Sequence, residues 1–398
     1  MKDRKYVIYI GAMVMPDKNA GALRAAALSK TLVEIGYKPI IIGLDYNIPE
    51  GKNILSTHKK YYGIDCYAIP YPDCINEWLH RMVSIGSFCE VMKQYGISRI
   101  YAVIAMDYEA LSLIRLNHFC RKHGIYLIAD NMEWYEKSGF PFPKNRIKDW
   151  DTNLRMKRIY PHMKNMICIS RFLYLYYSKT DKCKNIVMIP VTVDKSEPKW
   201  KELPVYQPNE VFTLIYAGNP GEHCIKERLD WLIRAVCKAN EIGLSCRLFI
   251  AGVEQHWFER QYPEFKNRKG YSGISYKGIL SHRECLVEIS NADMFTIIRE
   301  DRLVTRAGFP TKLAEGLACG TPVVTTPSGN IAEFIQGYEV GYVTKGFTYE
   351  DIERMLFDLL KLNKVELIAL HKQCKQYDQL DYLKFINYME TFFRNLIL

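Results

Sequence analysis

The stretch GFPTKLAEGLACGTPVVTT, residues 308–326, is the part of the chain from which its fold can be predicted. Pro310 and Thr311 open a helix, for which Thr311 is the expected N-cap. Gly320 should end this helix, and Pro322 excludes its continuation. The β-branched residues that follow Pro322 are typical of a strand. The stretch therefore predicts a loop, a short helix, a tight turn and a buried strand.

The charged residues of this helix suit a nucleotide diphosphate. Lys312 lies in the first turn, where free backbone N–H groups and the helix dipole favour an anion. Glu315 follows three residues later, and so lies on the same face. The cation and the N–H groups would hold phosphates, and the carboxylate would accept hydrogen bonds from a ribose diol. The alternative is an ordinary amphipathic helix with one surface ion pair, worth about 0.2–0.5 kcal/mol.

The letters FPTKLAEGLACGTPVV resemble the donor-site segment of family-4 glycosyltransferases, which are retaining enzymes of the two-Rossmann GT-B fold. The likeness is greatest to the branch of surface-polysaccharide pathways with the pattern P-T-K-x-x-E-x-x-A-x-G-T-P-V. The wider family often has two glutamates eight positions apart. Glu315 matches the second of them, whereas Ala307 stands at the first and departs from the pattern. The resemblance implies that Thr311, Lys312 and Glu315 contact the donor.

Length and composition allow two domains of ordinary size. The chain has 398 residues, of which 48% are hydrophobic and 25% charged, as in soluble globular proteins. The apolar run near the N-terminus alternates like a strand and is a poor signal peptide, and no stretch approaches the roughly 18 apolar residues of a spanning helix. We therefore expect a cytoplasmic protein. The 12 cysteines are scattered without C-x-x-C pairs, so neither structural zinc nor a disulfide framework is expected.

Both halves of the chain alternate apolar strands with helices, which indicates parallel sheets covered on both faces. In the first half we expect helices over residues 20–36, 76–96 and 108–123. A segment rich in proline and charge, residues 192–209, is the expected linker. We predict two Rossmann-like doubly wound α/β domains that face a central cleft. Residues 1–192 would form the acceptor domain and residues 193–381 the donor domain. The resemblance implies that a C-terminal helix, residues 382–398, crosses back to the first domain.

The loop after the first strand is the first candidate for donor contact. Gly21 gives close access to the backbone at a helix entry, and Arg24 matches an arginine that the resembled family often carries. The alternative is a tight turn with Arg24 on a solvated helix face. A G-x-G-x-x-G pattern is absent, which disfavours a nicotinamide or flavin cofactor.

Three further residues of the second domain are candidates through the same resemblance. Gly218 and Asn219 lie in a loop similar to the family's G-x-x-G loop. Lys226, or alternatively Arg228, would then pair with the β-phosphate. The alternative for both is surface charge at a helix start.

Arg299 directly follows a predicted strand, where a phosphate ligand would be met in a parallel sheet. Members of the resembled branch also have an arginine ahead of G-F-P-T-K. Arg299 and Lys312 are therefore the candidate catalytic residues, because both would stabilise the charge that grows on the leaving diphosphate.

The acceptor side is expected in the first domain. Asp130 ends the strand GIYLIAD and Glu133 follows it, and similar E-W-Y segments occur in the resembled branch. Either carboxylate could hold an acceptor hydroxyl, whereas the alternative is helix N-capping by Asp130 or Asn131.

Basic and aromatic residues are interleaved between Lys144 and Lys184. This pattern suits the anionic inner face of a membrane, at about 1 kcal/mol per basic residue, and a peripheral contact is expected there. It also suits nucleic acid, but no nucleic-acid motif accompanies it. A solvated basic face without a partner is the remaining alternative.

These observations predict a glycosyltransferase that moves a sugar from a nucleotide-diphosphate sugar to a glycan or lipid-linked saccharide with retention, in surface polysaccharide biosynthesis. The resemblance implies no metal, because protein cations replace it, and no other cofactor is expected. The alternatives are a nucleotide-sugar-binding protein without transferase activity, for which Ala307 leaves room, and a nucleotide-sugar epimerase. The epimerase needs several carboxylates and histidines in its cleft, and the P-T-K signature argues against it.

Overall fold

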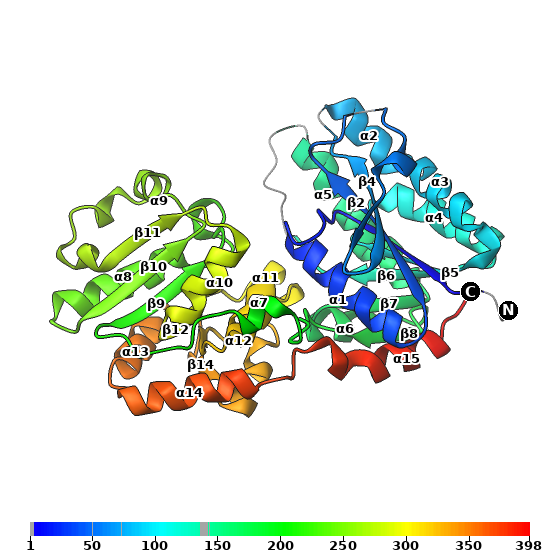
Figure 1. Cartoon of the computed structure of the whole chain (residues 1–398). Coiled ribbons are helices and arrows are strands. Elements are labelled where there is room, and N and C mark those ends of the chain that lie inside the picture. The colour runs from blue at the N-terminus through cyan, green and yellow to red at the C-terminus, as the bar shows by residue number, and fades with distance from the viewer. Residues whose placement is uncertain (1–3, 50, 73, 136–141, 143) are drawn as a thin grey trace. The chain divides into compact units, whose positions relative to one another are not determined.

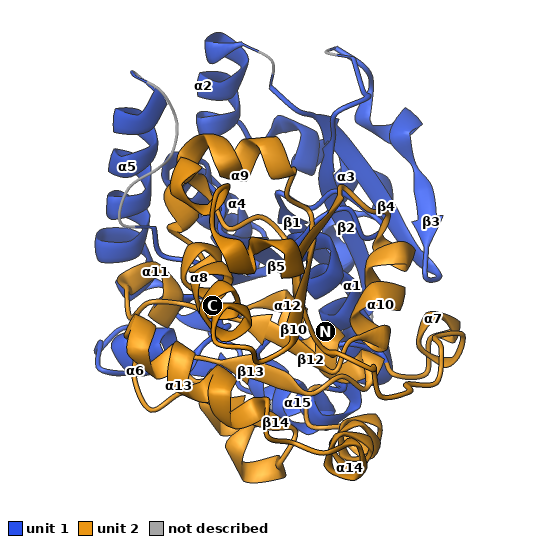
Figure 2. Cartoon of the chain, turned by 90° about the vertical axis from the view of Figure 1, so that its left-hand side faces the viewer, with its two compact units in different colours: residues 1–194, 307–309, 381–398 blue, residues 195–306, 310–380 orange. Residues whose placement is uncertain are grey.

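The computed structural model describes residues 4–49, 51–72, 74–135, 142 and 144–398. The chain forms two compact units, which Figure 1 shows by chain order and Figure 2 by colour. Unit 1 comprises Met1–Asp194, Ala307–Phe309 and Asp381–Leu398. Unit 2 comprises Lys195–Arg306 and Pro310–Leu380.

Unit 1 is built on an eight-stranded sheet with the order β3-β4-β2-β1-β5-β6-β7-β8. All neighbouring strands run parallel except β3 and β4. The strands are β1 (Tyr6–Gly11), β2 (Lys38–Asp45), β3 (Lys59–Tyr61), β4 (Ile64–Pro70), β5 (Ile100–Met106), β6 (Tyr126–Asn131), β7 (Asn165–Cys168) and β8 (Asn185–Met188). All but one residue in each of the central strands β1 and β5 are buried, as expected for a parallel sheet covered on both faces.

Helices flank this sheet (Figure 1). They are α1 (Ala20–Glu34), α2 (Ile75–Val83), α3 (Gly86–Tyr95), α4 (Ala110–Lys122), α5 (Lys144–Leu154), the π-helical turn η3 (Arg155–Ile159), α6 (Arg171–Ser178) and α15 (Ile386–Arg394). Shorter 3₁₀ turns are η1 (Ile54–Thr57), η2 (Ile97–Arg99), η4 (Tyr160–His162) and η10 (Tyr382–Phe385).

The single helix predicted over residues 76–96 is wrong, because the structure has two helices there, α2 and α3. The break lies at Ser84, whose backbone is extended. The hydroxyl oxygen of Ser84 accepts a hydrogen bond from the backbone N–H of Gly86 at 3.3 Å. A serine that bonds to nearby backbone competes with helix formation, and the glycine beside it lowers helix propensity further.

Unit 2 has a six-stranded, fully parallel sheet with the order β11-β10-β9-β12-β13-β14. Its strands are β9 (Phe212–Ala217), β10 (Cys246–Ala251), β11 (Ile274–Gly278), β12 (Met294–Ile297), β13 (Val323–Thr325) and β14 (Gly341–Val343). Its helices are α7 (Pro198–Lys201), α8 (Leu229–Glu241), α9 (Gln255–Gln261), α10 (His282–Asn291), α11 (Leu303–Ala307), α12 (Thr311–Cys319), α13 (Tyr349–Leu359) and α14 (Lys364–Gln376). The helical turn α7 lies within the segment predicted as a linker.

The predicted helix, turn and strand at residues 308–326 are present as α12, Gly320 and β13. Gly320 has the left-handed conformation (φ 83°) that suits a helix end. The predicted N-cap is wrong, however, because Thr311 is the first helical residue and Pro310 is the cap. The carbonyl of Pro310 already accepts the N–H of Leu313 at 3.1 Å. The helix also packs closely on β12, since a Cβ at Gly316 would lie 2.4 Å from Cδ1 of Phe295.

The C-terminal segment belongs to unit 1. The side-chain amide of Asn165 in β7 donates to the carbonyl of Ile397 at 2.8 Å, and that of Asn185 in β8 donates to the carbonyl of Phe392 at 3.0 Å.

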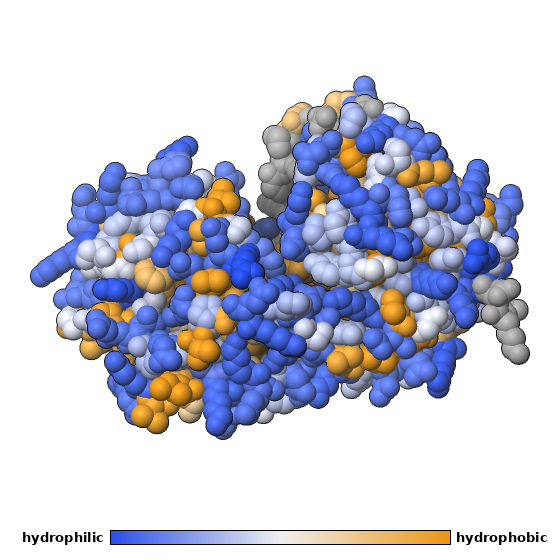
Figure 3. Space-filling model, viewed as in Figure 1, coloured by the Kyte–Doolittle hydropathy of each residue, from blue (hydrophilic) through white to orange (hydrophobic). Residues whose placement is uncertain are grey.

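Figure 3 shows a largely hydrophilic surface on the face drawn, with apolar residues scattered over it. Among the described residues, none of the helices combines the length and the apolar character needed to cross a bilayer.

Candidate functional site

A buried glutamate joins the two candidate catalytic cations of unit 2. Nζ of Lys312 lies 2.5 Å from Oε2 of Glu227, and Nε of Arg299 lies 3.4 Å from Oε1. Glu227 is only 2% exposed. Its segment follows β9, Arg299 follows β12, and Lys312 lies in the first turn of α12. Three segments that are distant in the sequence therefore meet at one carboxylate.

Gly218, at the end of β9, makes room for the ammonium group of Lys312. A Cβ at Gly218 would lie 2.7 Å from Nζ of Lys312, and the glycine has a φ of 127° that other residues rarely adopt. The ammonium group of Lys312 also lies 4.7 Å from the ring centroid of Tyr216, a residue of β9. The position of the Lys312 side chain thus depends on residue 218 being a glycine, which has no side chain to occupy that space.

The backbone of Arg299 is tied to the end of β13. Its N–H donates to Oγ1 of Thr326 at 2.9 Å, and the same hydroxyl donates to the carbonyl of Arg299 at 2.6 Å. These two bonds fix the residue at the carboxyl ends of β12 and β13, where ligands bind in parallel sheets.

The electrostatics of this cluster favour an anion. Burial raises the pKa of Glu227, but the charges of Lys312 and then Arg299 outweigh burial, so the net pKa lies below the usual range. Glu227 is therefore ionised at neutral pH, and two cations face one carboxylate. Lys312 and Arg299 keep side-chain exposures of 19% and 15%. Lys312, Arg299 and Glu227 together have one excess positive charge, and both cations are partly exposed. They can therefore bind a phosphate group, and the attraction grows when the bound phosphate displaces water from the cations.

The positive charge of Arg228, the alternative phosphate ligand, is balanced by ion pairs with two carboxylates. Its guanidinium donates to Asp230 at 2.9 and 2.5 Å and pairs with Glu300, and it lies over the ring of Trp231 at 3.7 Å. Lys226 is exposed and is the better candidate of the two on this ground.

Asn219 shapes the loop that precedes Lys226. Its side-chain oxygen accepts the N–H of Gly221 at 2.8 Å, which closes a turn. The backbone N–H of Lys226 donates to the carbonyl of Pro220 at 2.9 Å. The loop is thus held by local hydrogen bonds, and the Lys226 side chain extends from it into solvent.

Glu315 has a partner that the sequence did not indicate. Nε2 of His282 lies 2.7 Å from Oε1 of Glu315. His282 begins α10, whose capping box is formed by Ser281 and Glu284. The cap fixes the start of α10 and with it the position of the imidazole beside the carboxylate.

The structure corrects the roles predicted for Arg24 and Asp130. The two side chains are 1% and 0% exposed and form an ion pair of 2.7 Å inside unit 1. Arg24 also donates to the carbonyls of Ile189 and Pro190 at 2.9 and 3.0 Å, and the hydroxyl of Tyr9 donates to Asp130. Neither side chain is accessible to a donor or an acceptor. Asp130 lies in β6, so it caps no helix either.

Gly21 and Glu133 lie elsewhere in unit 1. Gly21 is the second residue of α1, whose N-cap Asn19 accepts the N–H of Ala22 with its side-chain oxygen at 2.9 Å. A Cβ at Gly21 would lie 3.3 Å from Sδ of Met106 at the end of β5. Glu133 is half-buried and accepts a hydrogen bond from the hydroxyl of Tyr135.

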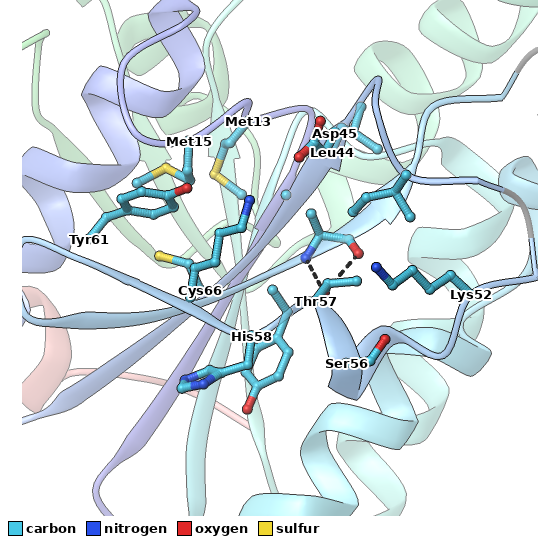
Figure 4. Close-up of a pocket in the computed structure, with 15 residues that line it drawn as sticks. Met13, Met15, Leu44, Asp45, Lys52, Ser56, Thr57, His58, Tyr61 and Cys66 are labelled. Atoms are coloured by element: carbon cyan, nitrogen blue, oxygen red, sulfur yellow. Dashed lines mark hydrogen bonds between the residues drawn. The ribbon is translucent and has the colours of Figure 1, made fainter.

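Unit 1 also contains a cavity beside the carboxyl end of β2 (Figure 4). It is lined by Met13, Leu44, Lys52 and Tyr61 among others, and its volume is about 120 Å³. The hydroxyl of Thr57 bridges the N–H and the carbonyl of Ala68 at 3.0 and 3.2 Å, as the dashed lines show. Pockets for small-molecule ligands usually measure about 300–1,000 Å³. The cavity is too small to carry an argument for a ligand.

In the ranges that the structure describes, His, Cys, Asp and Glu form no group of three or more that could hold a metal ion. Two functional candidates were missed by sequence reasoning, Glu227 and His282. Each stands in a polar stretch without a distinguishing motif, and its importance comes from a partner far along the chain.

Comparison with known proteins gives a family match for part of unit 2. Residues 211–361, within unit 2, match the family model described as glycosyl transferases group 1. No curated protein sequence matches the chain.

Solved structures share the fold over the whole chain. Sucrose-phosphate synthase from Thermosynechococcus elongatus has a TM-score of 0.72 at 13% identity, with 98% of each chain covered. The Anabaena protein HepE, solved with UDP and glucose, has a TM-score of 0.66 at 10% identity and covers 99% of this chain and 100% of its own. WaaG, a glycosyltransferase involved in lipopolysaccharide biosynthesis, has a TM-score of 0.63 at 12% identity, with 98% and 100% covered.

These likenesses confirm the predicted fold class, two Rossmann-like α/β units of the GT-B type. The match over residues 211–361 covers all three members of the Lys312–Glu227–Arg299 cluster. The family match and the fold together indicate that the chain is a glycosyltransferase.

Proposed function

We propose that the chain is a retaining family-4 glycosyltransferase of surface polysaccharide biosynthesis. It would move a sugar from a nucleotide-diphosphate sugar to a glycan or a lipid-linked saccharide. The single observation that carries the proposal is the pair of cations, Lys312 and Arg299, gathered on buried Glu227 at the start of α12. Such a group meets the charge that develops on a leaving diphosphate.

Each residue of the cluster has a role in this proposal. Lys312, Arg299 and the first N–H groups of α12, at Thr311, bind the phosphates, and Glu227 holds the two cations in place before the donor arrives. Glu315 accepts hydrogen bonds from the ribose, with its orientation fixed by His282. Lys226 adds a further contact to the β-phosphate.

The reaction exchanges one bond at the anomeric carbon for another. The acceptor hydroxyl oxygen forms a bond to the anomeric carbon while the bond between that carbon and the diphosphate oxygen breaks. The leaving phosphate takes the hydroxyl proton. The protein cations stabilise the leaving group, so the proposal includes neither a metal nor an organic cofactor. Retention is part of the proposal and would be read from the anomeric configuration of the product by NMR.

Thermal shift with UDP-, GDP- and CMP-sugars tests the donor site. A ligand that binds only the folded state at a hundred times its Kd stabilises it by about 2.7 kcal/mol. We expect one nucleotide sugar to stabilise the wild type and the shift to be lost in Lys312→Ala. Lys372→Ala on α14, an exposed lysine of the same unit, is the matched control and should keep the shift. Equal binding by Lys312→Ala, or no binding by the wild type, would exclude this donor site.

A peripheral contact with an anionic membrane is a second part of the proposal. Between residues 144 and 184, exposed apolar side chains (Trp150 51%, Leu175 48%, Tyr176 39%) accompany exposed basic ones. The exposed basic residues are Arg146, Lys157, Arg158, Lys164, Arg171, Lys179, Lys182 and Lys184. Flotation with phosphatidylserine vesicles should show binding that falls with salt. Absence of salt-sensitive binding would exclude the contact.

The alternative of a binding protein without transferase activity keeps one supporting observation, Ala307 in place of the family's first glutamate. It predicts nucleotide-sugar binding in the thermal-shift panel without release of nucleotide. The same samples, assayed for released nucleotide, separate the two functions.

A further inference from the structure

Three glycines stand at the carboxyl ends of three neighbouring strands of unit 2. Gly218 follows β9, Gly252 follows β10 and Gly278 ends β11, and their φ values are 127°, 87° and 64°. The N–H of Gly218 donates to the carbonyl of Ala251 at 3.0 Å, and that of Gly252 donates to the carbonyl of Gly278 at 2.7 Å. A Cβ at Gly252 would lie 2.9 Å from the carbonyl oxygen of Gly218. These three glycines form a glycine floor, a strip without side chains where a ligand can approach the backbone closely.

Charged side chains border the glycine floor on both sides of β10. A Cβ at Gly218 would lie 2.7 Å from Nζ of Lys312, and a Cβ at Gly278 would lie 3.0 and 3.8 Å from Oε1 and Oε2 of Glu254. Glu254 follows β10 by three residues and is exposed. Among the described residues, its carboxylate has no hydrogen-bond or ion-pair partner, and it does not cap the helix α9 that follows. Both carboxylate oxygens are therefore open to a ligand on the floor.

The loop after β11 connects the glycine floor to the candidate ribose ligand. His282, four residues after Gly278, begins α10, and its Nε2 lies 2.7 Å from Oε1 of Glu315. Four residues of extended chain span at most about 14 Å, so one nucleoside can cover the distance from Glu254 to Glu315. Ile279 lies between them in the sequence and is 83% exposed. A single exposed isoleucine is common on protein surfaces, but at this place it offers an apolar surface to the face of a base.

A carboxylate offers two acceptor oxygens and no donor, which restricts the bases that it can bind. The Watson–Crick edge of guanine presents two adjacent donors, N1–H and the 2-amino group, and so makes two parallel hydrogen bonds to one carboxylate. Uracil presents a single N3–H between two carbonyl oxygens, which would face the carboxylate and repel it. Cytosine and adenine each present one amino group beside an acceptor nitrogen. Of these four bases, guanine alone matches both oxygens of a carboxylate.

We propose that Glu254 makes the chain selective for a guanosine-diphosphate sugar, its carboxylate oxygens accepting hydrogen bonds from N1–H and the 2-amino group of guanine. This inference rests on the proposed transferase function and names the base of its donor. Lys312 and Glu315 would contact the phosphates and the ribose, which all nucleoside-diphosphate sugars share, so these two residues cannot distinguish one base from another. Glu254 is thus a specificity residue that touches no reacting atom. It belongs to unit 2, as do Lys312 and Glu315.

The test compares three nucleoside diphosphates on the full chain by isothermal titration. GDP carries both donors, IDP keeps N1–H but lacks the 2-amino group, and UDP has only N3–H. Glu254→Gln is the test variant, because it keeps the size of the side chain but replaces one acceptor oxygen by an amino group. Glu264→Gln, at an exposed glutamate of the same unit, is the matched control. Both positions are exposed, so both variants should unfold at the temperature of the wild type.

We expect the wild type to bind GDP about tenfold more tightly than IDP and about 10²-fold more tightly than UDP, because hydrogen bonds to a charged group are strong. Glu254→Gln should bind GDP about 10–100-fold more weakly and lose the preference for GDP over IDP. Its affinity for UDP should not fall, because uracil loses a repulsive contact. Glu264→Gln should keep the wild-type Kd for all three nucleotides. Lys312→Ala should weaken GDP and UDP binding by the same factor, since this lysine serves the phosphates.

Three results would overturn the inference. One is a wild-type affinity for UDP that equals or exceeds that for GDP, and another is equal affinity for GDP and IDP. The third is a preference for GDP over IDP that survives in Glu254→Gln. In each case, binding that Lys312→Ala weakens would leave the proposed donor site standing. Failure of the wild type to bind any of the three diphosphates would instead exclude the proposed function and this inference with it, so the two failures can be told apart.

Discussion

The ammonium of Lys312 lies 2.5 Å from a carboxylate oxygen of Glu227, a residue that is 85 positions earlier in the chain and 2% exposed. Arg299 shares the same carboxylate. A buried anion between two partly exposed cations holds them at a fixed separation. This arrangement explains how a site for a diphosphate can be ready before the ligand binds.

Glu227→Gln should destabilise the fold at pH 7. We expect a loss of about 1–3 kcal/mol in the free energy of unfolding, because two cations lose their common partner. Urea unfolding measures this loss, and Glu264→Gln, an exposed glutamate of the same unit, should be neutral.

The same variant has a predicted pH signature. The pKa of Glu227 is lowered in the folded state, so its stabilisation is present above the unfolded-state value and is lost as pH falls through the folded-state value. The free energy of unfolding of the wild type should therefore approach that of Glu227→Gln in acid. An advantage that stays constant from pH 7 down to pH 3 would contradict the ion-pair description.

Removal of either cation should slow transfer strongly. Lys312→Ala and Arg299→Ala are each expected to lower kcat by about 10²–10³, since each supplies charge to the leaving diphosphate. The double variant should lose less than the product of the two effects, because both residues act on one group. Steady-state kinetics with Lys372→Ala as control measures this, and unchanged kcat in either single variant would remove that residue from the mechanism.

Gly218→Ala should displace Lys312. The new Cβ would meet Nζ at 2.7 Å, and the φ of 127° is unfavourable for alanine. We expect a destabilisation of about 1–3 kcal/mol and weaker donor binding. Gly337→Ala is the control, because a Cβ there has no atom within 4 Å. Thermal unfolding with and without donor separates the loss of stability from the loss of donor binding. Normal donor affinity in Gly218→Ala would show that donor binding does not depend on the position of the Lys312 side chain beside Gly218.

Glu315 should recognise the ribose. Wild type is expected to bind GDP more tightly than 2′-deoxy-GDP by about 1–2 kcal/mol, and Glu315→Ala should lose this preference. His282→Ala should reduce it in part, since His282 orients the carboxylate at 2.7 Å. Isothermal titration with both nucleotides measures the preference, and an undiminished preference in Glu315→Ala would assign the ribose to another group.

Arg24 should behave as a structural residue. Arg24→Ala leaves Asp130 buried and unpaired, so we expect a loss of about 3–5 kcal/mol in the free energy of unfolding. The remaining folded protein should bind the donor with normal affinity. Weaker donor binding without loss of stability would restore the role that the sequence suggested for Arg24.

Much of the fold could be predicted because it depends on local signals. Apolar runs separated by helices indicated the parallel sheets, and Gly320 with Pro322 marked the end of α12. Predictions that depended on finer local competition were less reliable. Ser84 broke a helix that periodicity alone would continue, and the carbonyl of Pro310 took the place of a Thr311 cap.

The sequence by itself determined most of the strands and helices, the positions of Lys312 and Arg299 at the ends of their elements, and the place of Glu315 within α12. These follow from periodicity and turn residues, which act over a few neighbours. Only the tertiary structure decided which charges meet. It buried Arg24 with Asp130 and drew Glu227 and His282 to the donor residues. The reason is physical: an ion pair depends on distance in space and on burial, and neither is encoded by the spacing of residues along the chain.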